Sequence, residues 1–202
     1  MENNKVKLAI VYYSSTGANH QMAEWAKEAA EKYGAEVRLK KVEELVPEAG
    51  YSQNPAWKAH ADATKDVPLA TGDDLDWADA ILFSAPTRFG TLAAQMKYFI
   101  DGQGGLWAQR KLVNKVVSAM SSAQNVHGGQ EATILSLYTN MLHWGAIIVA
   151  PGYTDDVLYT TGGNPYGTSS QISGDGEILD NIQPAVEVQV KRMLDVAAQM
   201  KK

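Results

Sequence analysis

The sequence predicts a doubly wound α/β fold, in which helices cover both faces of a parallel β-sheet. Three observations predict it. Apolar runs alternate with segments of helical periodicity along most of the chain. The first run, residues 7–13, is continuously apolar after Lys7, which is typical of a strand buried on both faces. Strand, helix and strand also follow one another within residues 7–42, the length of one βαβ unit.

The first βαβ unit is read from three patterns. Residues 7–13 are the first predicted strand, rich in branched and aromatic side chains. Met22, Ala26 and Tyr33 then recur at helical spacing, and Gly34 is placed to end that helix. Residues 36–42 are the second strand. We expect the connection between the two strands to be right-handed.

The alternation continues to the C-terminal end of the chain. We predict further strands at 79–84, 115–120 and 145–149, and helices at about 90–100, 129–143 and 182–200. The pattern therefore contains five strands with helices between them. No second core and no internal repeat is visible, so residues 1–202 are predicted to form one domain.

Two long connections interrupt the alternation of predicted strands and helices. Residues 46–78 carry three prolines, with a short helix possible around 57–64. Residues 150–178 contain six glycines, including those of the string Gly162–Gly167. Long connections in a compact domain usually form part of a functional site or contact a partner, although a surface excursion is the simpler alternative.

The charge, the cysteine count and the apolar runs of the sequence exclude several classes of function. The net charge of −5 argues against a nucleic-acid-binding protein, which needs a basic face. The absence of cysteine excludes disulfides, thiolate metal sites and cysteine nucleophiles. The N-terminal apolar run is too short for a signal peptide, and no later run is long enough to span a membrane. We therefore expect a cytoplasmic protein.

The turn after the first strand has the features of an anion-binding loop. Ser14, Thr16 and Asn19 surround Gly17 at a predicted helix start, and the turn holds no lysine or arginine. Unpaired N–H groups at a helix start attract a phosphate without a cation. Neither G-x-x-x-x-G-K-[ST] nor G-x-G-x-x-G is present, which leaves a monophosphate as the ligand. Helix capping by Ser14 and Thr16 is an equally open interpretation.

Two more polar loops are predicted at the same edge of the sheet. Residues 86–90 follow the third strand and residues 121–129 follow the fourth. The carboxyl ends of parallel strands meet at one edge, where open α/β sheets bind ligands. Three converging loops indicate a ligand long enough to touch all of them.

The motifs resemble those of a known family. The pattern S-x-T-G-x-N at 14–19 resembles the phosphate loop of flavodoxin-like proteins that bind FMN. P-T-R-F-G at 86–90, G-Q-G-G-L-W at 102–107, G-G-Q-E at 128–131 and N-P-Y-G at 164–167 resemble the WrbA family of flavodoxin-like NAD(P)H:quinone oxidoreductases. The resemblance extends from about Val6 to the last helix.

The resemblance implies a flavodoxin-like three-layer sandwich, with a five-stranded parallel sheet in the order 2-1-3-4-5. It also implies noncovalently bound FMN and a homotetramer, a dimer of dimers, whose active sites are completed by neighbouring chains. The implied cofactor-binding residues are Ser14, Ser15, Thr16, Gly17, Ala18 and Asn19 for the phosphate, Pro86, Thr87, Arg88, Phe89 and Gly90 at the ring edge, Ser122, Ala123, Gln124, Asn125, Val126 and His127 at the pyrimidine side, and His143 near the flavin. Trp107 and Thr16 are the implied substrate-binding residues.

Several of these residues also have a simpler interpretation. Trp107 could be a core aromatic, and His143 could complement a helix dipole. His127 could be an exposed histidine, and Arg88 could pair with a surface carboxylate. His20 and His60 lack partners at metal-ligand spacing, so no metal site is predicted.

The predicted function is FMN-dependent transfer of two electrons from NAD(P)H to quinones by a ping-pong mechanism. The flavin carries the chemistry, so no catalytic side chain is assigned. A polar group at Arg88 or an N–H near Gly90 would stabilise charge on the reduced flavin. The alternative is a flavodoxin-type electron carrier with no turnover of its own. Carriers usually bear a strong acidic docking patch, and −5 over 202 residues is modest.

Overall fold

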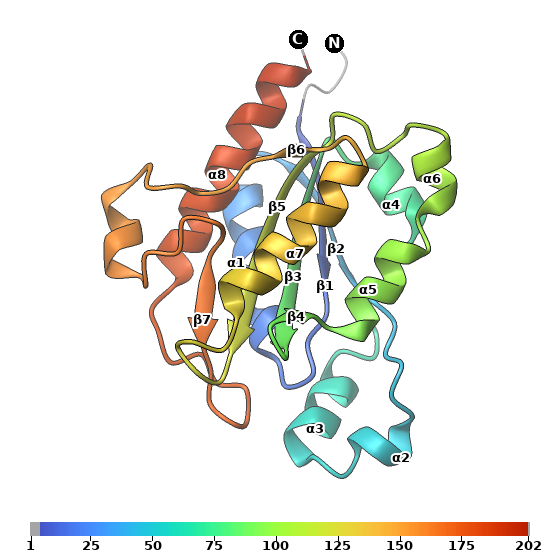
Figure 1. The fold of residues 1–202 in the computed structure, drawn as a ribbon, viewed down its shortest axis with the longest axis vertical. Helices are drawn as coiled ribbons and strands as arrows, with labels where there is room; N and C mark the ends of the chain where they lie inside the picture. The colour runs from blue at the N-terminus through green and yellow to red at the C-terminus, as the bar shows by residue number, and fades with distance from the viewer. Residues whose placement is uncertain (1–4, 202) are drawn as a thin grey trace.

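A parallel sheet forms the centre of the molecule (Figure 1). The computed structural model describes residues 5–201; residues 1–4, at the start of the segment considered for a signal peptide, lie outside them. The path through the sheet is β2-β1-β3-β5-β6, and every neighbouring pair on it is parallel. The strands are β1 (Lys7–Tyr12), β2 (Glu36–Lys41), β3 (Ala80–Arg88), β5 (Val116–Ala123) and β6 (Ile147–Ile148).

The sheet has seven strands, so the predicted five-stranded sheet in the order 2-1-3-4-5 was wrong. β4 (Thr91–Leu92) turns back antiparallel to β3, and β7 (Ser169–Gln171) pairs in parallel with the end of β5. Both strands are too short to show a hydrophobic period. β4 occupies residues that had been predicted as the start of a helix, and β7 lies inside the predicted 150–178 connection.

Helices cover both faces of the sheet and give the predicted three layers (Figure 1). α1 (Ala18–Lys32) and α8 (Gln183–Met200) pack on one face, with apolar residues of both in one buried cluster. α5 (Ala94–Asp101) and α7 (Gln130–His143) pack on the other. The connections contain α2 (Glu48–Tyr51), α3 (Pro55–Ala63), α4 (Gly72–Trp77), α6 (Gly104–Ala108) and the 3₁₀ helix η1 (Asp156–Thr160).

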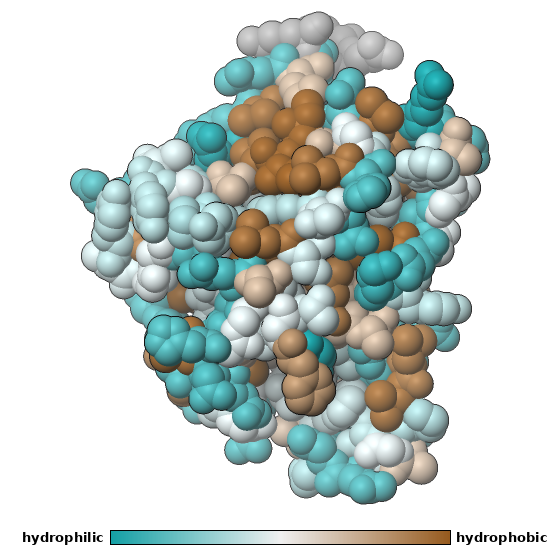
Figure 2. All heavy atoms as spheres, viewed as in Figure 1, coloured by the Kyte–Doolittle hydropathy of each residue, from teal (hydrophilic) through white to brown (hydrophobic). Residues whose placement is uncertain are grey.

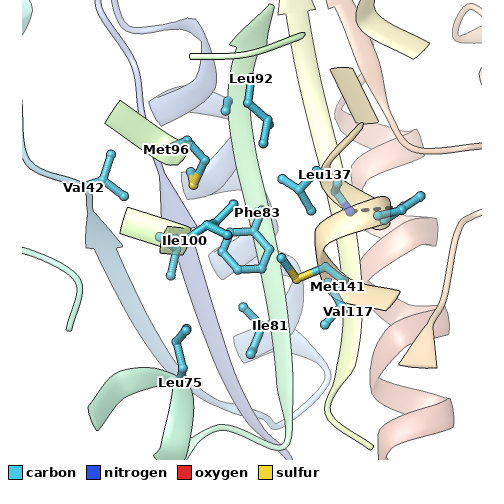
Figure 3. Packing of buried hydrophobic residues seen from close by; sticks show 14 of the residues in the cluster. Val42, Leu75, Ile81, Phe83, Leu92, Met96, Ile100, Val117, Leu137 and Met141 are labelled. Atoms are coloured by element: carbon cyan, nitrogen blue, oxygen red, sulfur yellow. Dashed lines mark hydrogen bonds between the residues drawn. The ribbon is translucent and has the colours of Figure 1, made fainter. Parts of the chain in front are cut away.

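Alternation along the strands divides the core into two halves. On β1, Leu8, Ile10 and Tyr12 face the α1–α8 layer, whereas Ala9 and Val11 face the other layer. This explains why residues 7–13 are continuously apolar, because both faces of β1 are buried. Figure 3 shows the second half of the core, where the ring of Phe83 on β3 lies among Met96, Ile100 and Met141. Rigid packing on both faces fixes the strand ends from which the site loops start.

Among the described residues, no helix combines the length and the apolar character needed to cross a bilayer.

Candidate functional site

A cavity of about 470 Å³ opens at the carboxyl ends of the strands, the lower edge of the sheet in Figure 1. Its volume is in the usual range for small-molecule sites. It lies beside β1 and β3, where the strand order reverses. The lining residues are Ser14, Ser15, Thr16, Ala18, Asn19, Asn54, Trp57, Pro86, Thr87, Arg88, Phe89, Ser122, Ala123, Gln124, Asn125, Gly128, Ile172 and Gly174. The three predicted segments therefore meet in one cavity, although residues 86–88 belong to β3 and residues 121–123 to β5, so both strands run further than predicted.

The loop between β1 and α1 is folded around Gly17. Gly17 has a φ of 108° and is the N-cap of α1, a conformation that favours glycine. Its N–H donates to the Ser14 hydroxyl over 3.0 Å. Ser14 thus shapes the loop from within, and no side chain caps the helix. The interpretation of Ser14 and Thr16 as helix caps was therefore wrong, because neither side chain bonds to an N–H of the first turn of α1.

The start of α1 presents free donors to the cavity. Within residues 5–201, no hydrogen-bond acceptor is found for the backbone N–H groups of Thr16, Ala18 and Asn19. The first turn of α1 carries no acidic residue that would compete with an anion. Free N–H groups and the positive end of the helix dipole together favour a bound phosphate.

A cation reaches this loop from another strand. Arg88, at the end of β3, donates from Nη2 to the Ser15 hydroxyl over 3.0 Å and from Nη1 to the Thr87 carbonyl over 3.0 Å. The loop sequence itself contains no positive charge, so this neighbour depends on the β1–β3 pairing. Arg88 had been considered as half of a surface ion pair; within the described residues no carboxylate forms a salt bridge with it.

The turn after Arg88 is a two-residue hairpin. Phe89 and Gly90 have φ values of 52° and 84° and join β3 to β4, as in a type I′ turn. The Phe89 side chain is fully exposed. The Gly90 N–H donates to the Thr87 hydroxyl over 3.1 Å, so the N–H that was expected to stabilise the reduced flavin is engaged within the turn. Thr133 of α7 also donates to the Thr87 hydroxyl, over 2.9 Å.

The third loop follows β5 and ends at a second left-handed glycine. Gly129 has a φ of 96° and is the N-cap of α7. A Cβ there would lie 2.7 Å from the Gly90 Cα, so the two loops touch through their glycines. Asn125 closes the loop by accepting at its carbonyl from the Gln130 amide, over 2.8 Å.

Asn19 joins the three loops from beneath the cavity. Its side-chain amide donates to the Ser84 hydroxyl over 3.0 Å, and its side-chain oxygen accepts from the Ser122 hydroxyl over 2.6 Å. The residue is 1% exposed. The two ends of the amide therefore hold the middle of β3 and the end of β5 against α1, in addition to lining the cavity.

Five lining residues were not predicted as site residues. Asn54 and Trp57 come from the α3 segment, Ile172 and Gly174 from the loop after β7, and Gly128 precedes α7. Gly174 and Gly176 belong to the glycine-rich connection 150–178, but nothing in the sequence indicated that this connection lies beside the phosphate loop. A Cβ on Gly176 would lie 2.3 Å from the Thr16 hydroxyl.

Not every predicted residue reaches the cavity. Gly17, Gly90, Val126 and His127 belong to the loops but do not line it, and His127 is exposed. His143 and Trp107 lie elsewhere: they line a separate hollow of about 230 Å³, where the Trp107 indole donates to the His143 carbonyl over 3.1 Å. His143 ends α7, about 20 Å along the helix from the cavity. One chain does not bring these two residues to the same cavity as the loops.

A comparison with protein families identifies the chain. Residues 6–154 match the family described as NADPH-dependent FMN reductase. The chain belongs to this FMN reductase family. The match covers β1 through β6 and includes all three loops of the cavity.

Curated relatives and solved structures agree with this membership. A Deinococcus radiodurans protein named NAD(P)H dehydrogenase (quinone) is 52% identical over 96% of this chain and 97% of its own length. A Brucella abortus protein of the same name is 40% identical over 96% and 98%. The structure of a WrbA-like flavodoxin from Agrobacterium tumefaciens superposes with a TM-score of 0.66 at 23% identity, over 96% of this chain and 99% of that one. The flavodoxin-like fold and the resemblance to the WrbA family are confirmed.

The residues of the cavity fit the FMN that this family binds. The free N–H groups and hydroxyls at the start of α1 suit a terminal phosphate. The cavity continues from there past Pro86 and Thr87 to the loop after β5, which suits an elongated ligand. The cavity therefore has the shape and the hydrogen-bond donors that FMN needs.

A half-buried pair of histidines lies behind the phosphate loop. The rings of His20 on α1 and His60 on α3 are 5.4 Å apart, and the Tyr12 ring stacks on His20 at 4.8 Å. Burial, then His20 and Lys41, lower the pKa of His60 to about 4. Burial also lowers the pKa of His20, although Glu24 opposes this. Both rings are therefore neutral near pH 7.

We expect acidification to destabilise this region through His60. Its pKa is 6.5 in the unfolded chain and about 4 in the folded one, so the unfolded chain binds more protons between these values. The contribution of His60 to the free energy of unfolding should therefore fall by about 1–2 kcal/mol, after allowance for solvent screening, as the pH drops from 6.5 to 4. Urea unfolding of wild type and His60→Gln across this range measures it. Equal pH slopes for the two proteins would contradict the assignment.

Proposed function

We propose that this chain is an FMN-dependent oxidoreductase that transfers two electrons from NAD(P)H to a quinone by a ping-pong mechanism. The observation that carries the proposal is the cavity of about 470 Å³ at the strand ends, with free N–H donors at one end and two polar segments along its length. The names of the relatives, NAD(P)H dehydrogenase (quinone), support the electron donor and the acceptor class.

The chain's own residues bind and orient the cofactor in this proposal. Residues 14–19 hold the phosphate through N–H groups and hydroxyls, with Arg88 beside Ser15 adding a positive charge. Residues 86–90 and 122–127 border the ring. When bound, FMN supplies the two-electron redox chemistry, so no side chain is needed as a nucleophile or base. Arg88, which also lies in the segment that borders the ring, would be the positive charge available to a ring that gains electrons.

We propose that the nucleotide and the quinone occupy the same open side of the cavity in turn. Two substrates that use one place one after the other give ping-pong kinetics. Thr16 lines this cavity and contacts the nucleotide in the proposal. Trp107 forms an aromatic wall for the quinone and His143 lies near the flavin, both supplied by a neighbouring chain because their own hollow is separate.

This arrangement requires the homotetramer that the resemblance implies. Apolar side chains gather on the face that carries α7 and β6, in the upper part of Figure 2. Leu135 and Leu142 of α7 have exposed side chains, and so does Trp107 of α6, although its indole N–H is bonded to the His143 carbonyl. Exposed apolar patches mark interfaces between proteins. Light scattering on the purified protein measures its oligomeric state, and a monomer at micromolar concentration would exclude the homotetramer.

We place the enzyme in the cytoplasm, where reduced nicotinamide nucleotides are available.

The test is spectroscopic and kinetic. The purified chain is loaded with FMN, and oxidation of NADH or NADPH is followed with and without benzoquinone. Fast turnover that depends on both flavin and quinone is the expected result. A bound flavin that neither nucleotide reduces would favour the flavodoxin-type carrier, which the names of the relatives support less. A chain that does not bind FMN would exclude both functions.

A further inference from the structure

Glu44 is surrounded by hydrogen-bond donors. It lies in the loop between β2 and α2. Its Oε2 accepts from the Tyr13 hydroxyl over 2.9 Å and from the Trp57 indole over 3.2 Å. Its Oε1 accepts from the Gln95 amide over 2.6 Å and from the Val46 N–H over 3.0 Å. One carboxylate thus accepts four hydrogen bonds, all of them half-buried.

Three of the four donors come from other segments, and the fourth, Val46, lies in the same loop as Glu44. Tyr13 directly precedes the phosphate loop, Trp57 belongs to α3 and Gln95 to α5. Trp57 lines the cofactor cavity, a neighbouring cavity of about 290 Å³ that also contains Glu44, and a third hollow beside Arg88. The Trp57 indole therefore separates the cofactor cavity from the two neighbouring hollows. Glu44 holds its N–H by a hydrogen bond.

The charge of Glu44 matters to this arrangement. Hydrogen bonds to an ionised acceptor are about twice as strong as neutral ones. An amide in its place accepts at one end only, and its NH₂ group would face either the Trp57 indole or the Val46 N–H, neither of which can accept a hydrogen bond. A partly buried donor left without an acceptor destabilises the arrangement. Burial and Glu44 together raise the pKa of Tyr13, while Arg88 opposes the shift, so the carboxylate and the guanidinium both act on this hydroxyl.

We propose that Glu44 is a positioning residue of the flavin cavity, which holds the Trp57 indole against the phosphate end through its carboxylate. It acts through Trp57 and does not itself line the cofactor cavity. This inference rests on the proposed function only in that the cavity holds FMN.

The test compares FMN affinity in three full-length variants. Glu44→Gln removes the charge with little change of shape, and Trp57→Phe removes the indole N–H but keeps an aromatic ring. Glu43→Gln is the matched control, because Glu43 is exposed and makes no hydrogen bond or ion pair among residues 5–201. Each flavin-free chain is titrated with FMN, and binding is read from the quenching of flavin fluorescence.

We expect Glu44→Gln to weaken FMN binding about tenfold, Trp57→Phe about threefold to tenfold, and Glu43→Gln less than about twofold. In the Trp57→Phe background, Glu44→Gln should weaken binding by less than about threefold, because its target is already gone. An unchanged affinity for Glu44→Gln would overturn the proposal, and so would a tenfold loss in both backgrounds.

Urea unfolding of each variant separates folding from binding. If Glu44→Gln does not fold, Trp57→Phe alone decides: weaker binding with an unchanged urea midpoint supports the proposal, and unchanged binding overturns it. The wild type separates this inference from the proposed function. A wild type that does not bind FMN contradicts the function, whereas a wild type that binds as well as Glu44→Gln contradicts only the role of Glu44.

Discussion

Gly167→Ala is expected to lower the free energy of unfolding by about 3–5 kcal/mol, or to prevent folding. A Cβ at this position would lie 2.0 Å from the Ala119 carbonyl oxygen and 3.1 Å from Ile134 Cδ1. The first neighbour is backbone in the middle of β5, so it cannot move aside as a flexible side chain can. This is the glycine of the N-P-Y-G string at 164–167.

The surroundings of Gly167 leave little freedom to relax. The Tyr138 hydroxyl donates to the Tyr166 carbonyl over 2.6 Å. Gln189 of α8, 0% exposed, donates to the Ala119 carbonyl over 2.9 Å and accepts from the Thr168 N–H over 2.7 Å. Moving the segment outward would break buried hydrogen bonds, which is costly because no water replaces them.

The matched control is Gly104→Ala. Gly104 begins α6, and a Cβ there meets nothing within 4 Å. Alanine is a better helix former than glycine, so this variant should unfold at an equal or slightly higher urea concentration. Equal urea midpoints for the two variants would show that the segment does not pack on β5 as described.

Gly176→Ala is expected to weaken FMN binding by at least about tenfold. Its Cβ would lie 2.3 Å from the Thr16 hydroxyl oxygen and 2.4 Å from the Thr16 carbonyl oxygen. The substitution must therefore push the loop after β7 away from the phosphate loop, or displace Thr16 itself. Either movement disturbs the N–H groups that face the cavity. Titration of the flavin-free chain with FMN measures the effect.

Gly162→Ala controls for backbone strain. Gly162 has a φ of 87°, close to the 90° of Gly176, but a Cβ there meets nothing within 4 Å. Both variants should lose about 1–2 kcal/mol of stability, because alanine is disfavoured at these angles. Only Gly176→Ala should lose FMN affinity. A similar affinity for the two variants would mean that the contact with Thr16 does not shape the phosphate loop.

Long periodic segments made the architecture predictable. The continuous apolar run at 7–13 indicated a strand buried on both faces, and the two halves of the core explain it. β4 and β7 escaped prediction because two or three residues show no period, and their pairing depends on the turn at Phe89–Gly90 and on the packing of Gly167. In the segment 46–78 the short helix considered around 57–64 is present as α3, which Asn54 caps, whereas α2 and α4, with its capping box at Thr71, were not predicted.

The site was predictable where it follows the strands. All three predicted segments at the carboxyl edge contribute to the cavity, partly through the last residues of β3 and β5, since parallel strands place their ends together. Contacts between distant segments were beyond sequence reasoning: Arg88 reaching Ser15, Trp57 held by Glu44, and Gly176 against Thr16. Each depends on how a connection folds back, which no local pattern specifies. Local patterns likewise could not separate His143 and Trp107 from the cavity of their own chain.

The most direct measurement compares FMN with riboflavin, which lacks the phosphate, as ligands of the flavin-free chain. The N–H groups of Thr16, Ala18 and Asn19 have no acceptor within the described chain, and Arg88 lies beside Ser15. Two or more hydrogen bonds to a charged phosphate correspond to a preference of at least about a hundredfold. We therefore predict that FMN binds at least a hundredfold more tightly than riboflavin. Equal affinities for the two flavins, or no binding of either, would contradict a phosphate-binding site at the start of α1.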